Sequence, residues 1–299
     1  MSTLITGATG LVGTRLAKQI DSVVATSRNA ESAKAKLGDS VHVVQWKSVD
    51  QPLDLSGVPK ISSVVNLMGD SIAKGRWSDA KKKSIRESRV QGTEQLVDAV
   101  LKLDPLPEVF VSASAVGYYG SRGDEELTES SSKGTGFLAD VCDEWEQATS
   151  RLKEAGVRTV IVRIGIVLAR EGGALAEMLT PFKLGVGGPL GNGSQYFPWV
   201  HIDDLVGIIL HSINTSNVSG VLNAAAPGIV TNKQWTAALA KQLHRPALLP
   251  VPKFALRLAI GEFADSLFFS QNVKPDAALA AGYQFKFSDL ESALANLID

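Results

Sequence analysis

A glycine-rich segment near the start of the chain carries the clearest chemical signal. Residues 6–13 read TGATGLVG, so Gly7, Gly10 and Gly13 stand at G-x-x-G-x-x-G spacing between a β-rich run and a stretch with helical periodicity. Glycines permit a tight turn and a close approach of backbone to pyrophosphate, and the N–H groups that begin a helix attract phosphate. This context predicts dinucleotide binding, a purely structural turn being the alternative. We expect the contacts to come from Gly7, Thr9, Gly10, Leu11, Val12 and Gly13.

The end of the second predicted strand indicates which dinucleotide the loop takes. A site selective for NAD carries an acidic residue there, to bind the ribose hydroxyls. This chain instead has Ser27 and Arg28, a hydroxyl followed by a guanidinium. A planar and permanently charged guanidinium suits a 2′-phosphate. We therefore predict NADP(H) as the cofactor, a solvated surface arginine being the alternative for Arg28.

These residues need a scaffold, and the pattern of the chain predicts one. The β-rich runs cover 3–6, 22–26, 41–46, 63–68, 108–114 and 157–164, and helical periodicity covers 11–20, 78–103 and 137–155. Alternating strands and helices predict an α/β fold, a Rossmann-type doubly wound parallel sheet. We expect an NADP-binding domain over residues 1–170, its sheet completed by parts of 200–225. A smaller helix-rich substrate lobe would follow over 171–299, including a C-terminal domain from about residue 246.

Composition excludes several classes of function. Thirty basic and 31 acidic residues give a formal charge of −1, whereas a nucleic-acid-binding protein usually shows a basic excess. The single Cys142 and four dispersed histidines predict no disulfide framework and no metal site. No segment has the run of about 18 apolar residues that spans a membrane, and a strand that begins at residue 2 or 3 leaves no room for a signal peptide. We expect a cytoplasmic protein that binds a small-molecule substrate.

Three further motifs stand at 66–69 (NLMG), 112–120 (SASAVGYYG) and 200–205 (VHIDDL). With the glycine loop, they resemble the atypical or extended short-chain dehydrogenases/reductases, in the epimerase-like branch, over essentially the whole chain. Stretches within 76–89, 181–201 and 245–285 are similar to the subgroup described as NAD(P)-dependent epimerase family proteins with a C-terminal domain of unassigned function. The resemblance implies the fold and a cofactor site that also includes Asn66, Leu67, Met68, Gly69 and Arg89. It implies no substrate, because one fold hosts many chemistries.

The catalytic pattern of that family is incomplete in this chain. Its usual Tyr-x-x-x-Lys dyad lies on the helix after the fifth strand, where the lysine lowers the pKa of the phenol. With residues 145–146 as the anchor, the two positions hold Leu138 and Cys142, and a frame shifted by one holds Phe137 and Val141. Neither pair exchanges a proton in the usual way, so the dyad is absent.

Ser114, Tyr118 and Tyr119 remain as candidates for catalysis. Ser114 ends a central strand, where sheets of this type bind ligands, and could hydrogen-bond a carbonyl or hydroxyl above the nicotinamide. One of the tyrosines would donate the proton, packing being the alternative for both. Arg89 replaces the family's asparagine and would face the cofactor cleft or form an ion pair on the helix surface.

Two segments in the second half of the chain have less direct interpretations. Asp203 and Asp204 after His201 suggest an acid/base pair, but a carboxylate doublet that opens a helix is usually a cap. Residues 185–193 hold five glycines and precede Phe197 and Trp199. This pattern predicts a mobile substrate-side loop with aromatic walls, suited to an apolar or mixed substrate. Residues 197–198 replace the Arg-Asp pair that grips sugar nucleotides in the family, which disfavours such a substrate.

Two functions remain open. The first is an NADP(H)-dependent oxidoreductase or epimerase-like enzyme that acts on an unidentified small carbonyl or hydroxyl compound by hydride transfer. The second is a non-catalytic NADP(H)-binding sensor or scaffold. The missing dyad favours the second function, and the intact segment around Ser114 favours the first. A homodimer formed through the helices after strands four and five is compatible with the resemblance.

Overall fold

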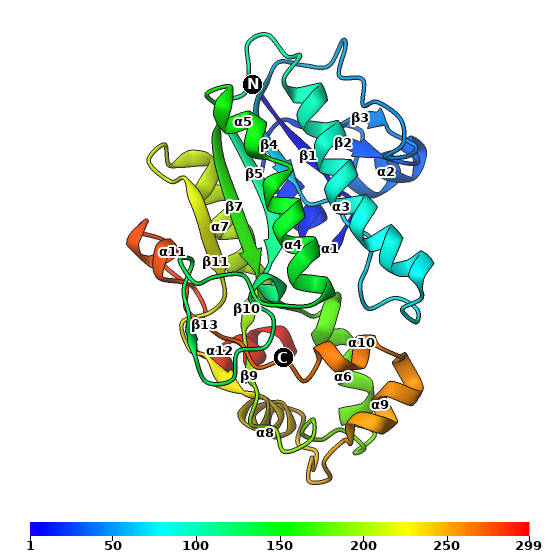
Figure 1. Ribbon diagram of the computed structural model, residues 1–299, viewed down its shortest axis with the longest axis vertical. Coiled ribbons are helices and arrows are strands. Elements are labelled where there is room, and N and C mark those ends of the chain that lie inside the picture. Colours follow the sequence, from blue (N-terminus) through cyan, green and yellow to red (C-terminus); the bar gives the residue numbers. More distant parts are fainter. Residues whose placement is uncertain (299) are drawn as a thin grey trace.

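A seven-stranded parallel sheet forms the centre of the computed structural model, which describes residues 1–298 (Figure 1). Its strands are β1 (Ser2–Thr6), β2 (Val23–Ser27), β3 (His42–Gln45), β4 (Ile61–Asn66), β5 (Val109–Ala115), β7 (Arg158–Ile164) and β11 (Gly220–Ala224). They lie in the order β11-β7-β5-β4-β1-β2-β3. From β1 the chain builds the sheet outward through β2 and β3, and it then returns to place β4 on the other side of β1. Ligands bind at the carboxyl edge of the sheet at such a switch point. The predicted Rossmann-type doubly wound sheet is confirmed.

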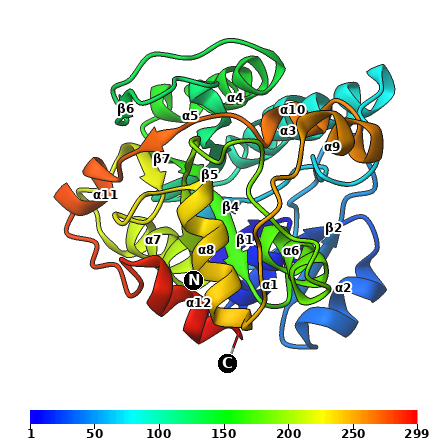
Figure 2. The ribbon, with the colours of Figure 1, turned by 90° about the horizontal axis from the view of Figure 1, so that it is seen from below.

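Helices cover both faces of this sheet. On one face lie α1 (Leu11–Ala17), α2 (Ala30–Leu37) and α7 (Ile202–Asn214), and on the other α3 (Asp79–Val100), α4 (Phe137–Gln147) and α5 (Ser150–Glu154) (Figures 1 and 2). Successive strand residues therefore enter different cores. Ile5 and Val65 pack in the core on the α1 and α7 side, whereas Leu4 and Val64 pack in the core on the α3 side. Burial on both faces explains why the strands read as continuous apolar runs.

A smaller lobe lies beyond the carboxyl ends of the strands (Figures 1 and 2). Its elements are β8 (Ile166–Ala169), α6 (Gly173–Lys183), β9 (Tyr196–Phe197), β10 (Trp199–His201), β12 (Val230–Thr231), α8 (Asn232–Leu243), α9 (Lys253–Ile260), α10 (Phe263–Ser266), β13 (Asn272–Val273) and α12 (Leu290–Ile298). The short helix α11 (Asp276–Ala280) instead packs against β11 at the edge of the main sheet. Two short elements from the first half reach toward it, η1 (Val116–Tyr119) and β6 (Glu126–Leu127), which pairs with β13. The lobe thus stands where a ligand at the sheet edge would be covered.

The core of this lobe overturns the predicted aromatic walls. Trp199 is fully buried, and its indole N–H donates to the carbonyl oxygen of Gly228 at 2.9 Å. Phe197 stacks on Trp235 with ring centroids 4.7 Å apart. Both rings hold α8 and the short strands together, because they supply the apolar area that a small lobe needs. The prediction that they line a substrate-side loop is therefore wrong.

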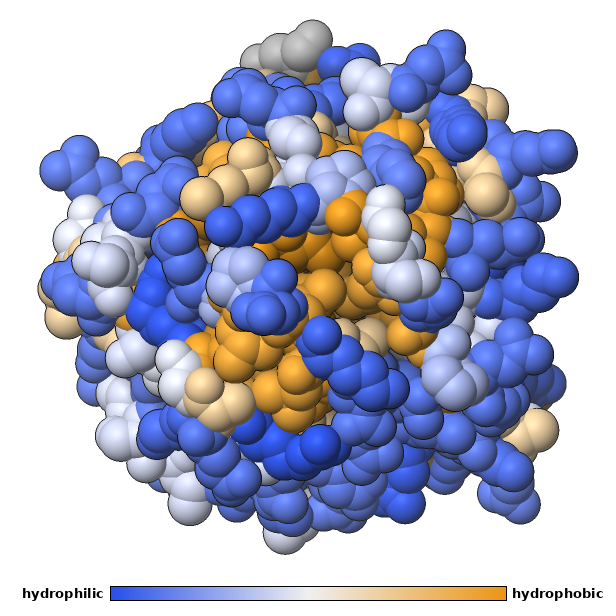
Figure 3. Space-filling view, turned by 90° about the horizontal axis from the view of Figure 1, so that it is seen from above, coloured by the Kyte–Doolittle hydropathy of each residue, from blue (hydrophilic) through white to orange (hydrophobic). Residues whose placement is uncertain are grey.

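Apolar side chains are exposed at both ends of the molecule. Seen from the end at which the strands begin, an apolar area lies in the middle of a hydrophilic rim (Figure 3). In the small lobe, the most exposed apolar residues are Leu184, Val186, Leu248, Leu249, Phe254 and Leu258. Within residues 1–298, no helix combines the length and the apolar character needed to cross a membrane.

Candidate functional site

The glycine loop has a geometry that larger residues could not adopt. Gly7 has a φ of +66°, and a Cβ atom built there would lie 2.5 Å from the carbonyl oxygen of Leu67. A Cβ atom at Gly13 would lie 2.3 Å from the carbonyl oxygen of Gly7. Gly10 is the N-cap of α1 and offers no capping side chain. The first N–H groups of the helix therefore stay available to a phosphate, as the sequence predicted for this loop.

The basic residues beside the loop come from β2 and α2. Ser27 ends β2, and its hydroxyl donates to the carbonyl oxygen of Asn29 at 2.9 Å. Arg28 follows with an exposed side chain. Lys36, on α2, reaches back across the loop and donates from Nζ to the carbonyl oxygen of Thr9 at 2.8 Å. Sequence reasoning missed Lys36, because only the fold brings α2 against residue 9.

The segment after β4 divides into a buried anchor and an accessible backbone. The Asn66 side chain is fully buried: it accepts from Thr6 Oγ1 at 2.7 Å and donates to Thr93 Oγ1 at 2.8 Å. These bonds connect β1, β4 and α3, and they occupy the hydrogen-bonding groups of the Asn66 side-chain amide. Any contact of residues 66–69 with a cofactor would therefore come from Leu67, Met68 and Gly69 rather than from the Asn66 side chain.

Arg89 lies directly under this segment. A Cβ atom at Gly69 would be 2.9 Å from its guanidinium carbon, so a larger residue there would require the arginine head group to shift. Arg89 Nη1 donates to the carbonyl oxygens of Asp70 and Ile85 at 3.0 and 3.1 Å, and the guanidinium lies 5.2 Å from the centre of the Trp145 ring. Burial lowers its pKa. These partners exclude the predicted alternative of an ion pair on the helix surface.

Ser114 stands at the centre of a polar cluster at the carboxyl end of β5. The side chain is buried, and its hydroxyl donates to Glu146 Oε1, on α4, at 2.6 Å. The same carboxylate receives two bonds from Arg163 on β7, Nε to Oε1 and Nη2 to Oε2, both at 2.8 Å. The pairing of β5 with β7 places Ser114 and Arg163 side by side. We call this the Ser114–Glu146–Arg163 cluster.

The two tyrosines predicted as proton donors have different surroundings. Tyr119 is fully buried, receives a hydrogen bond from Arg163 Nη1 at 3.0 Å and donates to Asn223 Oδ1 at 2.8 Å. Burial raises its pKa. Tyr118 is half-buried, and the centre of its ring lies 3.4 Å from the guanidinium carbon of Arg163. Tyr119 therefore supports the cluster from inside, whereas Tyr118 covers Arg163 on the more open side.

In the frame anchored on residues 145–146, Cys142 stands at the position at which the family pattern has lysine. Burial, assisted by the charge of Glu146, raises the pKa of the thiol to about 11. The thiol is therefore neutral near pH 7 and supplies neither a charge nor a proton acceptor. Glu146 lies one helical turn further along α4 and places its carboxylate in the cluster.

The residues around His201 have structural roles. The backbone N–H of Asp203 donates to His201 Nδ1 at 3.0 Å, so the histidine caps α7. Asp203 pairs with Arg15 at 2.6 Å. The buried Asp204 accepts from the backbone N–H groups of residues 286 and 287 at 2.7 and 3.0 Å. Asp203 and Asp204 thus have structural partners rather than the arrangement of an acid/base pair. The cap of α7 is the histidine and not a carboxylate. Over residues 1–298, no three His, Cys, Asp or Glu side chains gather as a metal site.

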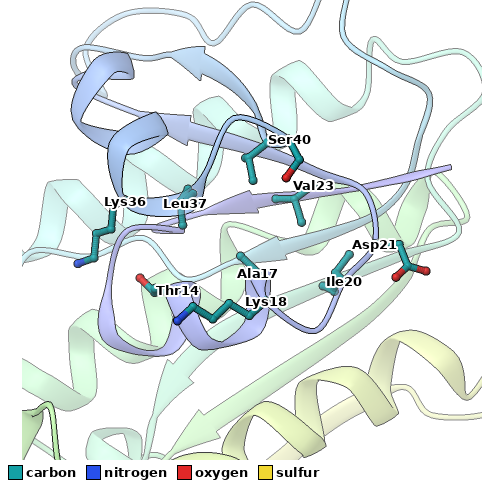
Figure 4. A pocket seen from close by; sticks show the side chains of 10 residues that line it. Thr14, Ala17, Lys18, Ile20, Asp21, Val23, Lys36, Leu37 and Ser40 are labelled. Atoms are coloured by element: carbon teal, nitrogen blue, oxygen red, sulfur yellow. The ribbon is translucent and has the colours of Figure 1, made fainter.

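A surface hollow between α1 and α2 lies away from the Ser114–Glu146–Arg163 cluster. It is lined by residues including Thr14, Lys18, Asp21, Lys36 and Ser40, with Lys36 and Asp21 toward opposite ends in Figure 4. Asp21 and Ser40 stand before β2 and β3, at the amino edge of the sheet. Ser114 stands at the carboxyl edge of β5. The hollow therefore offers nothing to the Ser114–Glu146–Arg163 cluster.

Sequence reasoning missed Glu146 and Arg163 as functional residues. In the sequence, Glu146 serves only to align the helix over 137–155, and residues 157–164 predict a buried strand. One signal was present, because an arginine inside the apolar run VIVRI of residues 160–164 is rarely buried without a partner. The partner itself was not identifiable, since α4 and β7 are brought together only by the fold.

Comparisons with known proteins agree with this geometry. The model of the NAD dependent epimerase/dehydratase family matches residues 3–225, and a domain of unknown function matches residues 251–297. The bovine epimerase family protein SDR39U1 is 37% identical over 303 residues, covering 100% of both chains. The crystal structure of human SDR39U1 (isoform2) with NADPH has a TM-score of 0.90, 35% identity and 99% coverage of each chain. UDP-glucuronic acid 4-epimerase from Bacillus cereus, at 17% identity and a TM-score of 0.80, shows the shared fold alone. The chain belongs to the NAD-dependent epimerase/dehydratase family.

Proposed function

We propose that this protein is an NADP(H)-dependent oxidoreductase or epimerase-like enzyme that acts on a small carbonyl or hydroxyl compound bound at Ser114. The residues around the glycine loop fit the cofactor. Side chains at Gly7 and Gly13 would clash with backbone, so the loop has the compact form that lets a pyrophosphate approach. The human relative crystallised with NADPH, 35% identical over 99% of the chain, supports the same cofactor here.

The proposed cofactor contacts follow from where each residue stands. The loop residues Gly7, Thr9, Gly10, Leu11, Val12 and Gly13 would hold the pyrophosphate. Ser27 and Arg28 would bind the 2′-phosphate, with Lys36 as a second cation close to the loop. Leu67, Met68 and Gly69, with Arg89 beneath them, would border the cofactor further along the sheet edge. When bound, NADP(H) supplies or accepts a hydride.

The observation that carries the catalytic part is the hydrogen bond from Ser114 to Glu146. The hydroxyl lies at the carboxyl end of β5, and the glycine loop follows β1 at the same edge of the sheet. Ser114 can orient the oxygen of a substrate, and the carboxylate behind it can hold a proton. Although the Tyr-x-x-x-Lys dyad is absent, the chain thus keeps the serine of the family pattern, with a carboxylate hydrogen-bonded to it.

Binding and turnover test the two parts of this proposal separately. Titration by nicotinamide fluorescence should show tighter binding of NADPH than of NADH. Arg28→Ala should weaken NADPH binding by about 1.5–3 kcal/mol, the scale of a charge-assisted bond, and hardly change NADH binding. Equal losses of affinity for NADPH and NADH would show that Arg28 does not bind the 2′-phosphate. Oxidation of NADPH by a panel of small carbonyls, lost in Ser114→Ala while binding persists, would establish a reductase.

A non-catalytic NADP(H)-binding protein is the second candidate. The residues at the family's dyad positions favour it, because Leu138 carries no titratable group and the Cys142 thiol is neutral near pH 7. This candidate predicts tight NADPH binding with no oxidation of the cofactor by any carbonyl in the panel. Any Ser114-dependent turnover would exclude it.

A further inference from the structure

The Ser114–Glu146–Arg163 cluster has the arrangement of a proton relay. Resting on the proposed function, we infer that Ser114 passes the proton of the reacting oxygen to and from Glu146, so that a glutamate replaces the tyrosine as acid/base. The substrate class is then a secondary alcohol and its ketone.

The single hydrogen of Ser114 decides which substrate form the site accepts. It is donated to Glu146 Oε1 at 2.6 Å, so the hydroxyl oxygen has only lone pairs left for a further partner. A carboxylate at Glu146 therefore favours a substrate hydroxyl, which donates to Ser114. When Glu146 holds a proton, it can donate to Ser114, whose hydrogen then turns to a carbonyl oxygen. The protonation of one carboxyl group would thus select between alcohol and ketone.

The other groups facing Glu146 cannot replace it as proton acceptor. Arg163 from β7 and Arg89 from α3 remain charged, since a guanidinium does not lose its proton in proteins. Burial raises the pKa of Cys142 on α4 to about 11 and also raises that of Tyr119 on η1. Two further groups lie beside Arg163 within residues 1–298. The Glu129 carboxylate accepts from the backbone N–H groups of Asn223 and Ala277, and the Tyr118 ring stacks on the guanidinium of Arg163, which leaves Tyr118 as the competitor to test.

Arg163 and Tyr119 act as positioning residues. Two parallel bonds from Arg163, both at 2.8 Å, fix the plane of the Glu146 carboxylate. Tyr119 and Asn223 hold the far side of Arg163 through the tyrosine hydroxyl. Oε1 therefore stays directed at Ser114 without movement of any backbone. A fixed acceptor at this distance is what efficient proton transfer requires.

The relay balances with hydride transfer. In the oxidation of an alcohol, the substrate hydroxyl proton moves to Ser114 Oγ while the Ser114 proton moves to Glu146 Oε1. The hydride leaves the substrate carbon for the oxidised nicotinamide of NADP, and the C–O single bond becomes a carbonyl. The substrate loses two electrons, which the nicotinamide gains. Reduction of the ketone reverses each transfer.

The first test is the pH profile of kcat and kcat/KM for oxidation of cyclohexanol, isopropanol and lactate with NADP as oxidant. Glu146→Gln should lower kcat by about 100- to 10,000-fold and remove the acid limb, with NADPH binding unchanged. Glu144→Gln is the matched control, because Glu144 lies on α4 but pairs with Arg86 at the surface at 3.0 Å. It should match the wild type. Tyr118→Phe should keep the acid limb.

Each alternative outcome has a distinct meaning. An acid limb that survives in Glu146→Gln, or that disappears in Tyr118→Phe, overturns the relay but leaves the proposed function standing. No oxidation of any of the three alcohols by the wild type, together with no reduction of their ketones, contradicts the relay and its substrate class, and the wider panel of small carbonyls then decides the proposed function.

The second test needs neither turnover nor a folded Glu146 variant. Infrared difference spectra between low and high pH follow the carboxylic acid bands of the wild type and of Ser114→Ala, both loaded with NADPH. Loss of the donated hydrogen bond destabilises the carboxylate form, so one carboxyl band should titrate at higher pH in Ser114→Ala. Identical titrations in the two proteins would show that Ser114 and Glu146 are not coupled, and would overturn the relay.

Discussion

Replacing Arg163 with methionine tests the structural basis of the cluster. Methionine fills most of the space of the arginine stem but provides no donor. Glu146 would lose both bonds of 2.8 Å that Arg163 gives it, and Tyr119 would lose the donor at 3.0 Å. The variant thus keeps a carboxylate in a buried site without its cation.

The expected loss of stability follows from the burial of the two partners. Removing one member of a buried ion pair costs about 3–5 kcal/mol, because the other charge is left uncompensated. The side chain of Arg163 is only 4% exposed and that of Glu146 is 13% exposed. Water therefore reaches the carboxylate in part, and the Ser114 bond remains. We expect the lower end of the range, about 3 kcal/mol.

Urea unfolding of wild type, Arg163→Met and the double variant Arg163→Met with Glu146→Leu measures this loss. The double variant carries no uncompensated charge and should be more stable than Arg163→Met. The deficit of Arg163→Met should also shrink at lower pH, since protonation neutralises the abandoned carboxylate. A loss below about 1 kcal/mol, or a double variant no better than the single one, would refute the reasoning.

Three further predictions concern the scaffold. Gly7→Ala should abolish NADPH binding and should lower the free energy of unfolding more than Gly75→Ala does. Both glycines have a positive φ (+66° and +80°), but only at residue 7 would a Cβ atom meet backbone, at 2.5 Å from the carbonyl oxygen of Leu67. Equal losses of stability in the two variants would show that φ alone matters. Asp204→Ala leaves the backbone N–H groups of residues 286 and 287 without their acceptor, at a cost of about 1–3 kcal/mol each. Amide hydrogen exchange over residues 283–298 should therefore become faster. Unchanged exchange there would show that Asp204 does not anchor this segment. Burial lowers the pKa of His201, so the unfolded chain protonates first and stability falls as the pH drops below about 6.5. His201→Asn keeps an acceptor for the helix cap, so its free energy of unfolding, measured with urea, should depend less on pH in this range. An unchanged pH dependence would show that another group causes the decline.

The fold was accessible from the sequence because local pattern and tertiary structure agree in the first half of the chain. The predicted strands at 63–68 and 157–164 correspond to β4 and β7 at Ile61–Asn66 and Arg158–Ile164. Residues buried on both faces of a parallel sheet need apolar side chains at every position, and this requirement is visible locally. The glycine loop was equally accessible, since its spacing and its place between strand and helix define it.

The proposed acid/base group was not accessible, because it depends on side chains that meet across the fold. The Tyr-x-x-x-Lys positions are fixed by helical spacing, so the absence of the dyad could be read directly in either frame, Leu138 with Cys142 or Phe137 with Val141. The partnership of Glu146 with Ser114 and Arg163 depends on how α4 packs against β5 and β7. Trp199 was misread for a similar reason, since the short strands of the small lobe are defined by pairing rather than by a local period.

Transfer of deuterium from labelled cofactor tests the central claim most directly. Wild type and Ser114→Ala would be incubated with NADPH carrying deuterium at the transferable position and a metabolite extract, and the products followed by mass spectrometry. Our account predicts at least one small hydroxyl compound that gains a single deuterium with the wild type and not with Ser114→Ala. Tight NADPH binding with no such product beyond the Ser114→Ala background would contradict hydride transfer and identify a non-catalytic binding protein.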